Sequence, residues 1–219
     1  MKPWEAEIIG EEARAVRTKL STAGWALTTG AQLGLRRDIV GALWRHKTEP
    51  DPRAPTKRHA RDVISYQRTE GDILTAEEES IAFTTERGEV IDDFSRFWSL
   101  SGWWGRRMAA TFLSLIPPSD AWEAGFVSAD YFAYSPGTVV GPHQDKFGRY
   151  VMLWCTERSP DVKGGASTLD GPHGSYLRAP LHSDEILIFN DEKFTHGFTL
   201  LEAGTREALI MIELRKGQS

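Results

Sequence analysis

The sequence predicts an α+β, mainly β fold: a double-stranded β-helix, or cupin-like jelly roll, supported by N-terminal helices. Before the pair Pro117-Pro118, apolar residues recur mostly at helical spacing. After that pair, short runs of β-branched and aromatic residues alternate with Gly, Pro and Asp turns. Helices followed by a series of short strands are typical of an antiparallel double sheet that is buttressed by helices.

The first half of the chain is expected to supply these helices. Residues 10–23 and 35–44 place apolar side chains on one helix face between charged ones, and a third helix is expected over 106–115, before the prolines. The acidic segment 71–88 is interpreted as a solvated helix face. The aromatic-rich segment 91–104 is interpreted as core or as the wall of a cleft.

Strands are expected mainly in the second half. Residues 25–27 and 61–67 are candidate early strands, and the two prolines in 51–56 predict a loop. The later strands are expected at 127–134, 139–143, 150–155, 166–169, 175–177, 185–189, 194–199 and 208–214.

The chain is expected to form one domain over 1–219, because it contains no internal repeat and no linker rich in Gly or Ser. Within it, 1–118 would be a helical support and lid region, and 119–219 the jelly-roll catalytic core. Residues 51–90 are expected to supply the lid and the specificity.

Charge and composition restrict the partners. The net charge is −5, from 26 basic and 31 acidic residues, which does not favour nucleic acid or anionic lipid. No apolar run approaches the length that crosses a bilayer, and the first residues lack the apolar segment of a secretory signal. The single cysteine, Cys155, lies in an apolar run and fits a reducing compartment. A cytoplasmic location is therefore expected.

A candidate metal site joins two distant parts of the second half. In a strand, His143 and Asp145 point to the same side because side chains alternate faces with period two. His196 follows 53 residues later in another expected strand. Two imidazoles and one carboxylate hold Fe(II) and leave positions open for substrate and dioxygen. The other histidines show no comparable spacing and are interpreted as structural: His46, His59, His173 and His182.

Arg206 is the candidate anion-binding residue of this site. If His196 ends one strand and Arg206 begins an antiparallel partner, the turn over 202–205 brings the guanidinium back toward the metal. There it can bind a carboxylate through two parallel hydrogen bonds. The alternative is a surface salt bridge with Glu202 or Glu207.

His143-x-Asp145, His196 and Arg206 together resemble the motif of the Fe(II)- and 2-oxoglutarate-dependent dioxygenase superfamily. More narrowly, the sequence is similar to the bacterial L-isoleucine dioxygenase type of free amino-acid hydroxylase. This similarity covers about residues 127–214 and is carried by Pro142-His143-Gln144-Asp145, Glu157-Arg158-Ser159, Gly164-Gly165-Ala166 and the run from Phe189 to Gly197.

The resemblance implies the cofactors and the reaction. His143, Asp145 and His196 would be the catalytic Fe(II) ligands, and Arg206 would bind the C5 carboxylate of the cosubstrate 2-oxoglutarate. Oxidation by O2 would hydroxylate an unactivated C–H bond of a small molecule, with release of succinate and CO2. A free amino acid or a related biosynthetic intermediate is the expected substrate. Halogenases of this kind carry a small residue at the place of Asp145, so its presence favours hydroxylation or desaturation.

Further contacts to 2-oxoglutarate are less defined. Tyr131 or Tyr134 could donate a hydroxyl to it, with core packing as the alternative, and Thr199 could assist Arg206. Many relatives carry a serine or threonine two residues past the arginine, but here that position is Ala208. The second contact to the cosubstrate is therefore not identified by the motif.

The substrate contacts and the reaction class leave alternatives. Arg158 could bind a substrate carboxylate. An oxygenase acting on a protein or peptide also fits the motif, as does a non-oxygenase, cupin-like metal protein. A nucleic-acid demethylase would resemble the chain as well, but that group carries a second arginine where this sequence has Ile212. The oligomeric state stays open.

Overall fold

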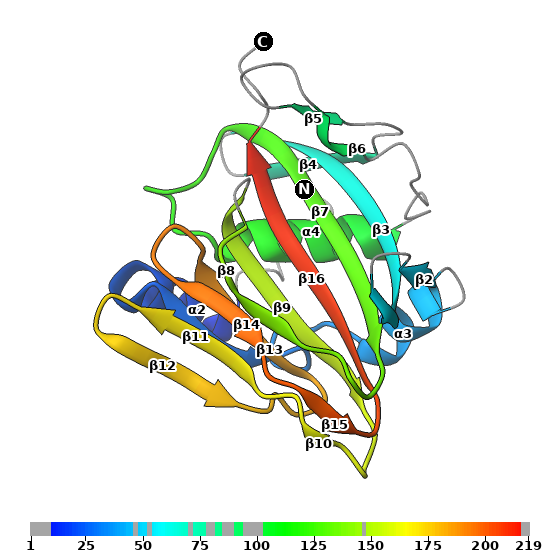
Figure 1. The fold of residues 1–219 in the computed structure, drawn as a ribbon. Helices are drawn as coiled ribbons and strands as arrows, with labels where there is room; N and C mark the ends of the chain where they lie inside the picture. Colours follow the sequence, from blue (N-terminus) through cyan, green and yellow to red (C-terminus); the bar gives the residue numbers. More distant parts are fainter. Residues whose placement is uncertain are drawn as a thin grey trace.

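Two antiparallel β-sheets face each other, and helices cover the outer side of the larger sheet (Figure 1). The structure is a computed structural model, and it describes residues 10–45, 48–51, 54–69, 72–77, 82–84, 90–93, 103–145 and 148–215. Its described helices are α2 (Glu11–Ala23), α3 (Arg37–Arg45) and α4 (Trp103–Leu115). No helix in these ranges is long and apolar enough to cross a membrane.

The larger sheet contains eight strands, and the smaller sheet contains four. In spatial order the larger sheet runs β1 (Trp25–Thr29), β13 (Glu185–Asn190), β9 (Gly148–Arg158), β16 (Arg206–Arg215), β7 (Ala124–Tyr134), β3 (Ala54–Thr69) and β2 (Glu49–Asp51), with β4 (Asp72–Glu77) also paired to β3. The smaller sheet runs β12 (Gly174–Ala179), β11 (Ser167–Gly171), β14 (Thr195–Phe198) and β8 (Val140–His143). Two further pairs are β10 (Lys163–Gly164) with β15 (Leu201–Ala203), and β5 (Ala82–Thr84) with β6 (Val90–Asp93).

The helices form where the sequence places an apolar stripe between defined ends. In α2, Ala13, Val16 and Leu20 are buried at helical spacing, and Glu11 lies in the first turn, where it complements the helix dipole. Gly24 ends the helix in the left-handed conformation (φ 79°), and its N–H donates to Leu20 O. The buried stripe packs on the larger sheet as part of its main hydrophobic core.

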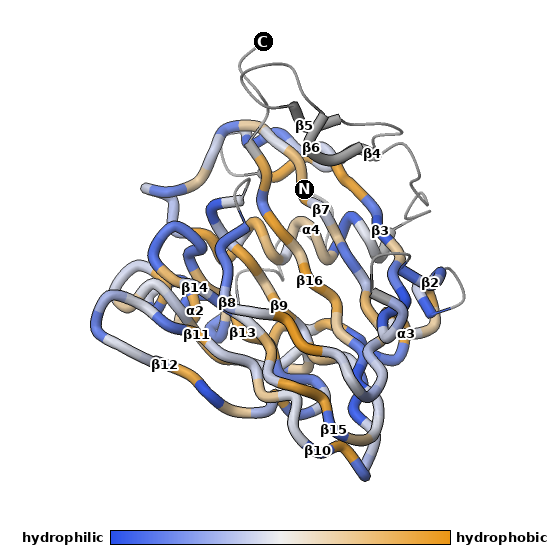
Figure 2. Tube along the Cα trace, viewed as in Figure 1, coloured by the Kyte–Doolittle hydropathy of each residue, from blue (hydrophilic) through white to orange (hydrophobic). Residues whose placement is uncertain are grey.

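Along the central strands, side chains alternate between this core and a pocket between the two sheets. Hydrophobic residues continue along β9 and β16, which appear largely orange in Figure 2. The residues of β7 and β16 that face the helices are in the main core: Val127, Ala129, Tyr131, Leu209 and Met211. Their neighbours on the opposite face line a pocket between the two sheets: Asp130, Phe132, Tyr134, Arg206, Ala208, Ile210 and Ile212. One strand therefore supplies both core and site.

The expected jelly-roll fold with supporting helices is confirmed. Three of the four expected helices are present, and each of the eight expected later strands overlaps an observed strand. The helix expected over 71–88 is wrong, because the described residues there form β4 and β5. In the aromatic segment 91–104, Phe94, Phe97 and Trp98 lie outside the described residues.

The first half also contributes strands to the sheet that it was expected only to support. The region 51–56, expected as a loop, contains the end of β2 and the start of β3. β3 extends over 16 residues and pairs with β7 along most of its length. Its length was missed because one face of it is polar: Ala60, Ile64 and Tyr66 enter the core, whereas alternate positions carry basic side chains toward the pocket.

Candidate metal centre

Three potential metal ligands converge at one end of the smaller sheet. His143 ends β8 and lies opposite His196 of β14 in the strand register, and Asp145 follows two residues after β8. Asp145 Oδ1 is 3.7 Å from His143 Nε2, and Asp145 Oδ2 is 3.4 Å from His196 Nε2. Potential ligand atoms of the three residues all lie within 4.8 Å of one another. The structure thus brings together the three residues that the sequence pairs as ligands.

Both imidazoles are oriented by contacts at their other ring nitrogen. His143 Nδ1 lies 2.9 Å from Gly141 O, and a carbonyl oxygen can only accept, so Nδ1 carries the proton and Nε2 keeps its lone pair. His196 Nδ1 lies 3.2 Å from Asp191 Oδ1. Neither of these two atoms has another hydrogen-bond partner in the described structure. A carboxylate at this place favours the same tautomer and increases the basicity of Nε2.

Asp191 is a residue that the sequence reasoning missed. It follows the buried end of β13, its side chain is 2% exposed, and its backbone oxygen accepts a hydrogen bond of 2.8 Å from Gln144 Nε2. Gln144 thereby links the Asp191 turn to the segment between His143 and Asp145. The signal in the sequence was an acidic residue directly after an apolar strand and five residues before His196.

Asp191→Asn is expected to weaken divalent-metal binding by about 10- to 100-fold, because it removes the charge that holds the His196 proton on Nδ1. The substitution keeps the side-chain volume, so the fold should persist. Titration with Fe(II) under anaerobic conditions measures the affinity. Asp161→Asn is the matched control, because Asp161 is exposed and is not among the converging ligands. Equal affinity of Asp191→Asn and wild type would contradict the orienting role.

The close approach of the strands at the triad depends on Gly197. A Cβ atom at this position would lie 2.9 Å from Val140 O, which is closer than such contacts occur, so a side chain there would push β14 away from β8. Asp145 is partly enclosed, with its side chain 25% exposed. Burial raises the pKa of Asp145, and the nearby His196 opposes this rise. Burial of a carboxylate between two imidazoles favours a bound cation.

Arg206 lies in the same pocket and is 2% exposed. Its guanidinium lies over the Phe198 ring, 4.7 Å from the centroid, and contacts Ser167 Oγ at 3.2 Å and Gly165 O at 3.4 Å. These partners are uncharged, and Nε is buried without a hydrogen-bond partner. The surface salt bridge with Glu202 or Glu207 is absent from the described ion pairs, where Glu207 binds Arg45 instead. A buried guanidinium without a carboxylate is suited to bind an anion.

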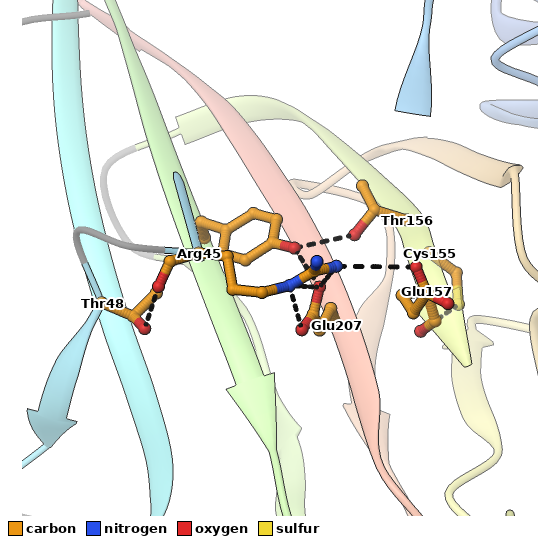
Figure 3. Close-up of polar contacts among 7 residues, drawn as sticks. Arg45, Thr48, Cys155, Thr156, Glu157 and Glu207 are labelled. Carbon is orange, nitrogen blue, oxygen red and sulfur yellow. Dashed lines mark hydrogen bonds and ion pairs between the residues drawn. The ribbon is translucent and has the colours of Figure 1, made fainter. Parts of the chain in front are cut away.

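Tyr131 does not reach this pocket, contrary to expectation. It lies on the helix-facing side of β7, stacks on Trp44, and donates its hydroxyl hydrogen bond to Glu207. Arg45 also donates hydrogen bonds to Glu207 (Figure 3), and Thr156 Oγ1 contacts the Tyr131 hydroxyl. Burial, supported by Glu207, raises the pKa of Tyr131 and keeps it protonated. Alternation is the physical reason: Tyr131 and Tyr134 are an odd number of residues apart, and the pocket takes Tyr134.

Two other expected contacts also lie outside the pocket lining. Thr199 Oγ1 accepts a hydrogen bond of 2.8 Å from Ala166 N and so holds β14 to the start of β11. Arg158 lies opposite Arg206 in the strand register, at the end of β9, but does not line the pocket. Ser167, which the sequence did not single out, is the hydroxyl residue that contacts Arg206. No local sequence signal pointed to it.

A second polar group lines the pocket on β3 and β7, in the same sheet as Arg206. Asp130 is 2% exposed and accepts hydrogen bonds from Arg61 Nε, from Ser128 Oγ at 2.7 Å and, with Nε2 as the donor, from His59 at 2.7 Å. Burial alone would raise its pKa, but Arg61 and His59 outweigh this effect and hold the pKa at about 2. His59 is therefore structural, as expected, and Lys57 lies beside this group in the lining.

Comparison with solved structures shows the fold. The chain is similar to a bsmA homolog from Methylobium petroleophilum PM1 (TM-score 0.69, 15% identity, 94% of each chain covered). It is similar to IDO from Bacillus thuringiensis (TM-score 0.68, 13% identity, 95% of this chain and 97% of that chain). It is also similar to the Fe(II)/α-ketoglutarate-dependent dioxygenase TqaL (TM-score 0.67, 14% identity, 100% and 92%).

These structural similarities show a shared double-stranded β-helix over nearly the whole chain. The sequence itself matches no model of a protein family and none of the curated proteins. What the site does is therefore inferred from its own residues.

Proposed function

We propose that this protein is an Fe(II)- and 2-oxoglutarate-dependent dioxygenase that hydroxylates an unactivated C–H bond of a small molecule. The observation that carries the proposal is one pocket with two different components. His143, Asp145 and His196 converge on one point, and the buried Arg206, which lacks a carboxylate partner among the described residues, lines the same cavity. The likeness to TqaL supports it, since that protein is an Fe(II)/α-ketoglutarate-dependent dioxygenase.

The donor set fits a ferrous ion. Two neutral imidazoles and one carboxylate on one side of a metal are typical of non-haem Fe(II) oxygenases, whereas structural zinc sites are closed by four ligands. No fourth His, Cys, Asp or Glu joins the triad within the described residues. When bound, iron with 2-oxoglutarate and O2 would supply the oxidation of the C–H bond, with succinate and CO2 as products.

The chain's own residues would orient the metal ligands, bind 2-oxoglutarate and enclose the reacting carbon. Gly141 O and Asp191 hold the two imidazoles with Nε2 toward the metal position. Arg206 would bind the distal carboxylate of 2-oxoglutarate. Ser167, which contacts Arg206, would supply the hydroxyl group that Ala208 lacks. Apolar side chains keep water from the reacting carbon: Phe132, Val140, Leu153, Phe198, Ile210 and Ile212.

The cavity lined by the triad and Arg206 has a volume of about 180 Å³, which 2-oxoglutarate would share with the substrate, and this favours a small substrate. A free amino acid or a related biosynthetic intermediate is the substrate that the sequence resemblance supports. A protein or peptide substrate is the alternative, since similar folds include a prolyl hydroxylase in complex with a peptide fragment, from Trichoplax adhaerens.

Anaerobic addition of Fe(II) and then 2-oxoglutarate tests the proposal. A visible metal-to-ligand charge-transfer band is expected, because the cosubstrate would bind the iron directly. Admission of air should then release succinate slowly even without a substrate. Tight Fe(II) binding with neither the band nor succinate would instead support a cupin-like metal protein of another kind.

A further inference from the structure

The wall formed by β3 has a charge arrangement that the proposed cofactors do not use. In the register between β3 and β7, Lys57 pairs with Tyr134 and Arg61 pairs with Asp130. Directly paired residues of antiparallel strands point to the same face. Because Tyr134 and Asp130 line the pocket, Lys57 and Arg61 face it too, and both are in its lining. The pocket therefore has basic side chains on the same sheet face as Arg206, and Lys57 lies two strands away from Arg206, across Tyr134.

Arg61 is neutralised on this wall. It shares Asp130 with His59, and the pKa of Asp130, at about 2, keeps this carboxylate ionised at neutral pH. Ser128 Oγ donates a hydrogen bond to the other carboxylate oxygen of Asp130, Oδ2. Asp130 is thus committed to groups of the protein. It is a fixed part of the wall and does not offer a free carboxylate to a ligand.

Lys57 is different, because its described interaction is with an aromatic ring. Its ammonium lies 5.9 Å from the centroid of Phe132, and none of the described ion pairs gives it a carboxylate partner. A cation over a ring is stabilised only weakly when it remains partly solvated. Within the described lining, the acidic residues are Asp130, which is engaged as above, and Asp145, which belongs to the metal triad.

The balance of charges in the pocket indicates which kind of ligand Lys57 would bind. If the proposed function holds, the two negative charges of 2-oxoglutarate are matched by Arg206 and by the ferrous ion with Asp145. Asp130 matches Arg61. Lys57 is then the positive charge of the described lining that has no counter-charge, and a partly enclosed cation gains most from a charged hydrogen-bond acceptor.

We propose that Lys57 binds an acid group of the substrate, and that the substrate is therefore a small carboxylic acid. This inference rests on the proposed function and assigns its substrate class. The carboxylate lies against β3, and the body of the substrate is enclosed by the apolar residues of the central strands, such as Leu153 and Ile210. Lys57 thus takes the carboxylate-binding role that the sequence suggested for Arg158, since Arg158 lies outside the pocket lining.

Matched acids and amides test this assignment. The probes are the standard amino acids, their N-acetyl derivatives and the corresponding deaminated acids, each beside its primary carboxamide. Stimulation of succinate release above the substrate-free rate is measured for wild type, Lys57→Met, Lys57→Arg and Lys19→Met. Lys19 is an exposed residue of α2 outside the pocket and serves as the matched loss of a lysine.

We expect at least one acid to stimulate wild type and its amide to be at least tenfold less effective. In Lys57→Met the apparent KM for that acid should rise about 10- to 100-fold, as loss of a charged hydrogen bond predicts, while the KM for 2-oxoglutarate is unchanged. Lys57→Arg should restore part of the acid preference, and Lys19→Met should behave as wild type.

Three results would overturn the assignment: equal response of wild type to acid and amide, an undiminished acid preference in Lys57→Met, or no response to any acid of the panel. The charge-transfer band separates these outcomes from failure of the proposed function. A band in wild type and in Lys57→Met shows that the iron and cosubstrate site is intact. Absence of the band from wild type would overturn the function itself.

Discussion

His143→Ala and Asp145→Asn are each expected to weaken Fe(II) binding by more than about 100-fold, because loss of a residue that only orients a ligand already costs about 10- to 100-fold. Succinate release should disappear with the metal. Asp145→Asn keeps an oxygen at the same place but removes the charge, and His143→Ala removes the nitrogen altogether. The comparison therefore separates the electrostatic contribution of the site from its coordination.

The metal-free variants should remain folded. The His143 side chain is 40% exposed and that of Asp145 is 25% exposed, so neither is needed to fill the core. Burial raises the pKa of Asp145, so its charged form is unfavourable in the fold without a cation, and Asp145→Asn should be at least as stable as wild type at neutral pH. His173→Ala, an exposed histidine on the turn between β11 and β12, is the control. Equilibrium dialysis that gives full metal occupancy in both variants would exclude this triad as the iron site.

Arg206→Met is expected to raise the dissociation constant for 2-oxoglutarate between about 30-fold and a few thousand-fold, because removal of one partner from a buried charge pair costs roughly 2–5 kcal/mol. Fe(II) affinity, measured without 2-oxoglutarate, should stay at the wild-type value, since Arg206 is not part of the triad. Arg206→Lys keeps the charge but loses the planar guanidinium, so its dissociation constant for 2-oxoglutarate should lie between those of wild type and Arg206→Met.

Thermal unfolding gives an independent check on Arg206. Its guanidinium is 2% exposed, and Nε has no hydrogen-bond partner, so without an anion it carries a desolvation cost. Arg206→Met should therefore unfold at no lower temperature than wild type when Fe(II) is present alone. Addition of 2-oxoglutarate should stabilise wild type and leave the variant unchanged. Equal stabilisation of both proteins would show that the cosubstrate binds elsewhere.

The wall built from β3 shows what the sequence could not decide. Lys57, His59 and Arg61 occupy alternate positions that are visible in the sequence, yet residue 57 meets residue 134 only because β3 pairs with β7 in the folded sheet. Such long-range register depends on the packing of the whole sheet. The basic residues also hid the strand, because a face that lines a polar pocket lacks the apolar alternation by which strands are recognised.

Tyr131 shows the same limit within one well-predicted strand. β7 was expected almost at its observed bounds, but both of its faces carry aromatic side chains, with Tyr131 on one and Phe132 and Tyr134 on the other, so these side chains do not say which face turns toward the helices. A choice between Tyr131 and Tyr134 therefore required the position of the helices. Asp191 and Ser167 likewise became visible only when turns and strands distant in sequence came together around His196 and Arg206.

The sequence by itself determined the jelly-roll fold with its helices, and the combination of His143, Asp145, His196 and Arg206. The strand pattern gave the fold, and period-two spacing predicted that His143 and Asp145 share one side. The antiparallel pairing expected between the strands of His196 and Arg206 is wrong, because β14 and β16 lie in different sheets and Arg206 enters the pocket from the larger one. The tertiary structure alone decided which residues contact the two imidazoles, which tyrosine lines the pocket and which cation of the described lining has no carboxylate partner. Those contacts depend on which faces of paired strands turn inward, and only the packing of two sheets and the helices against one another sets that.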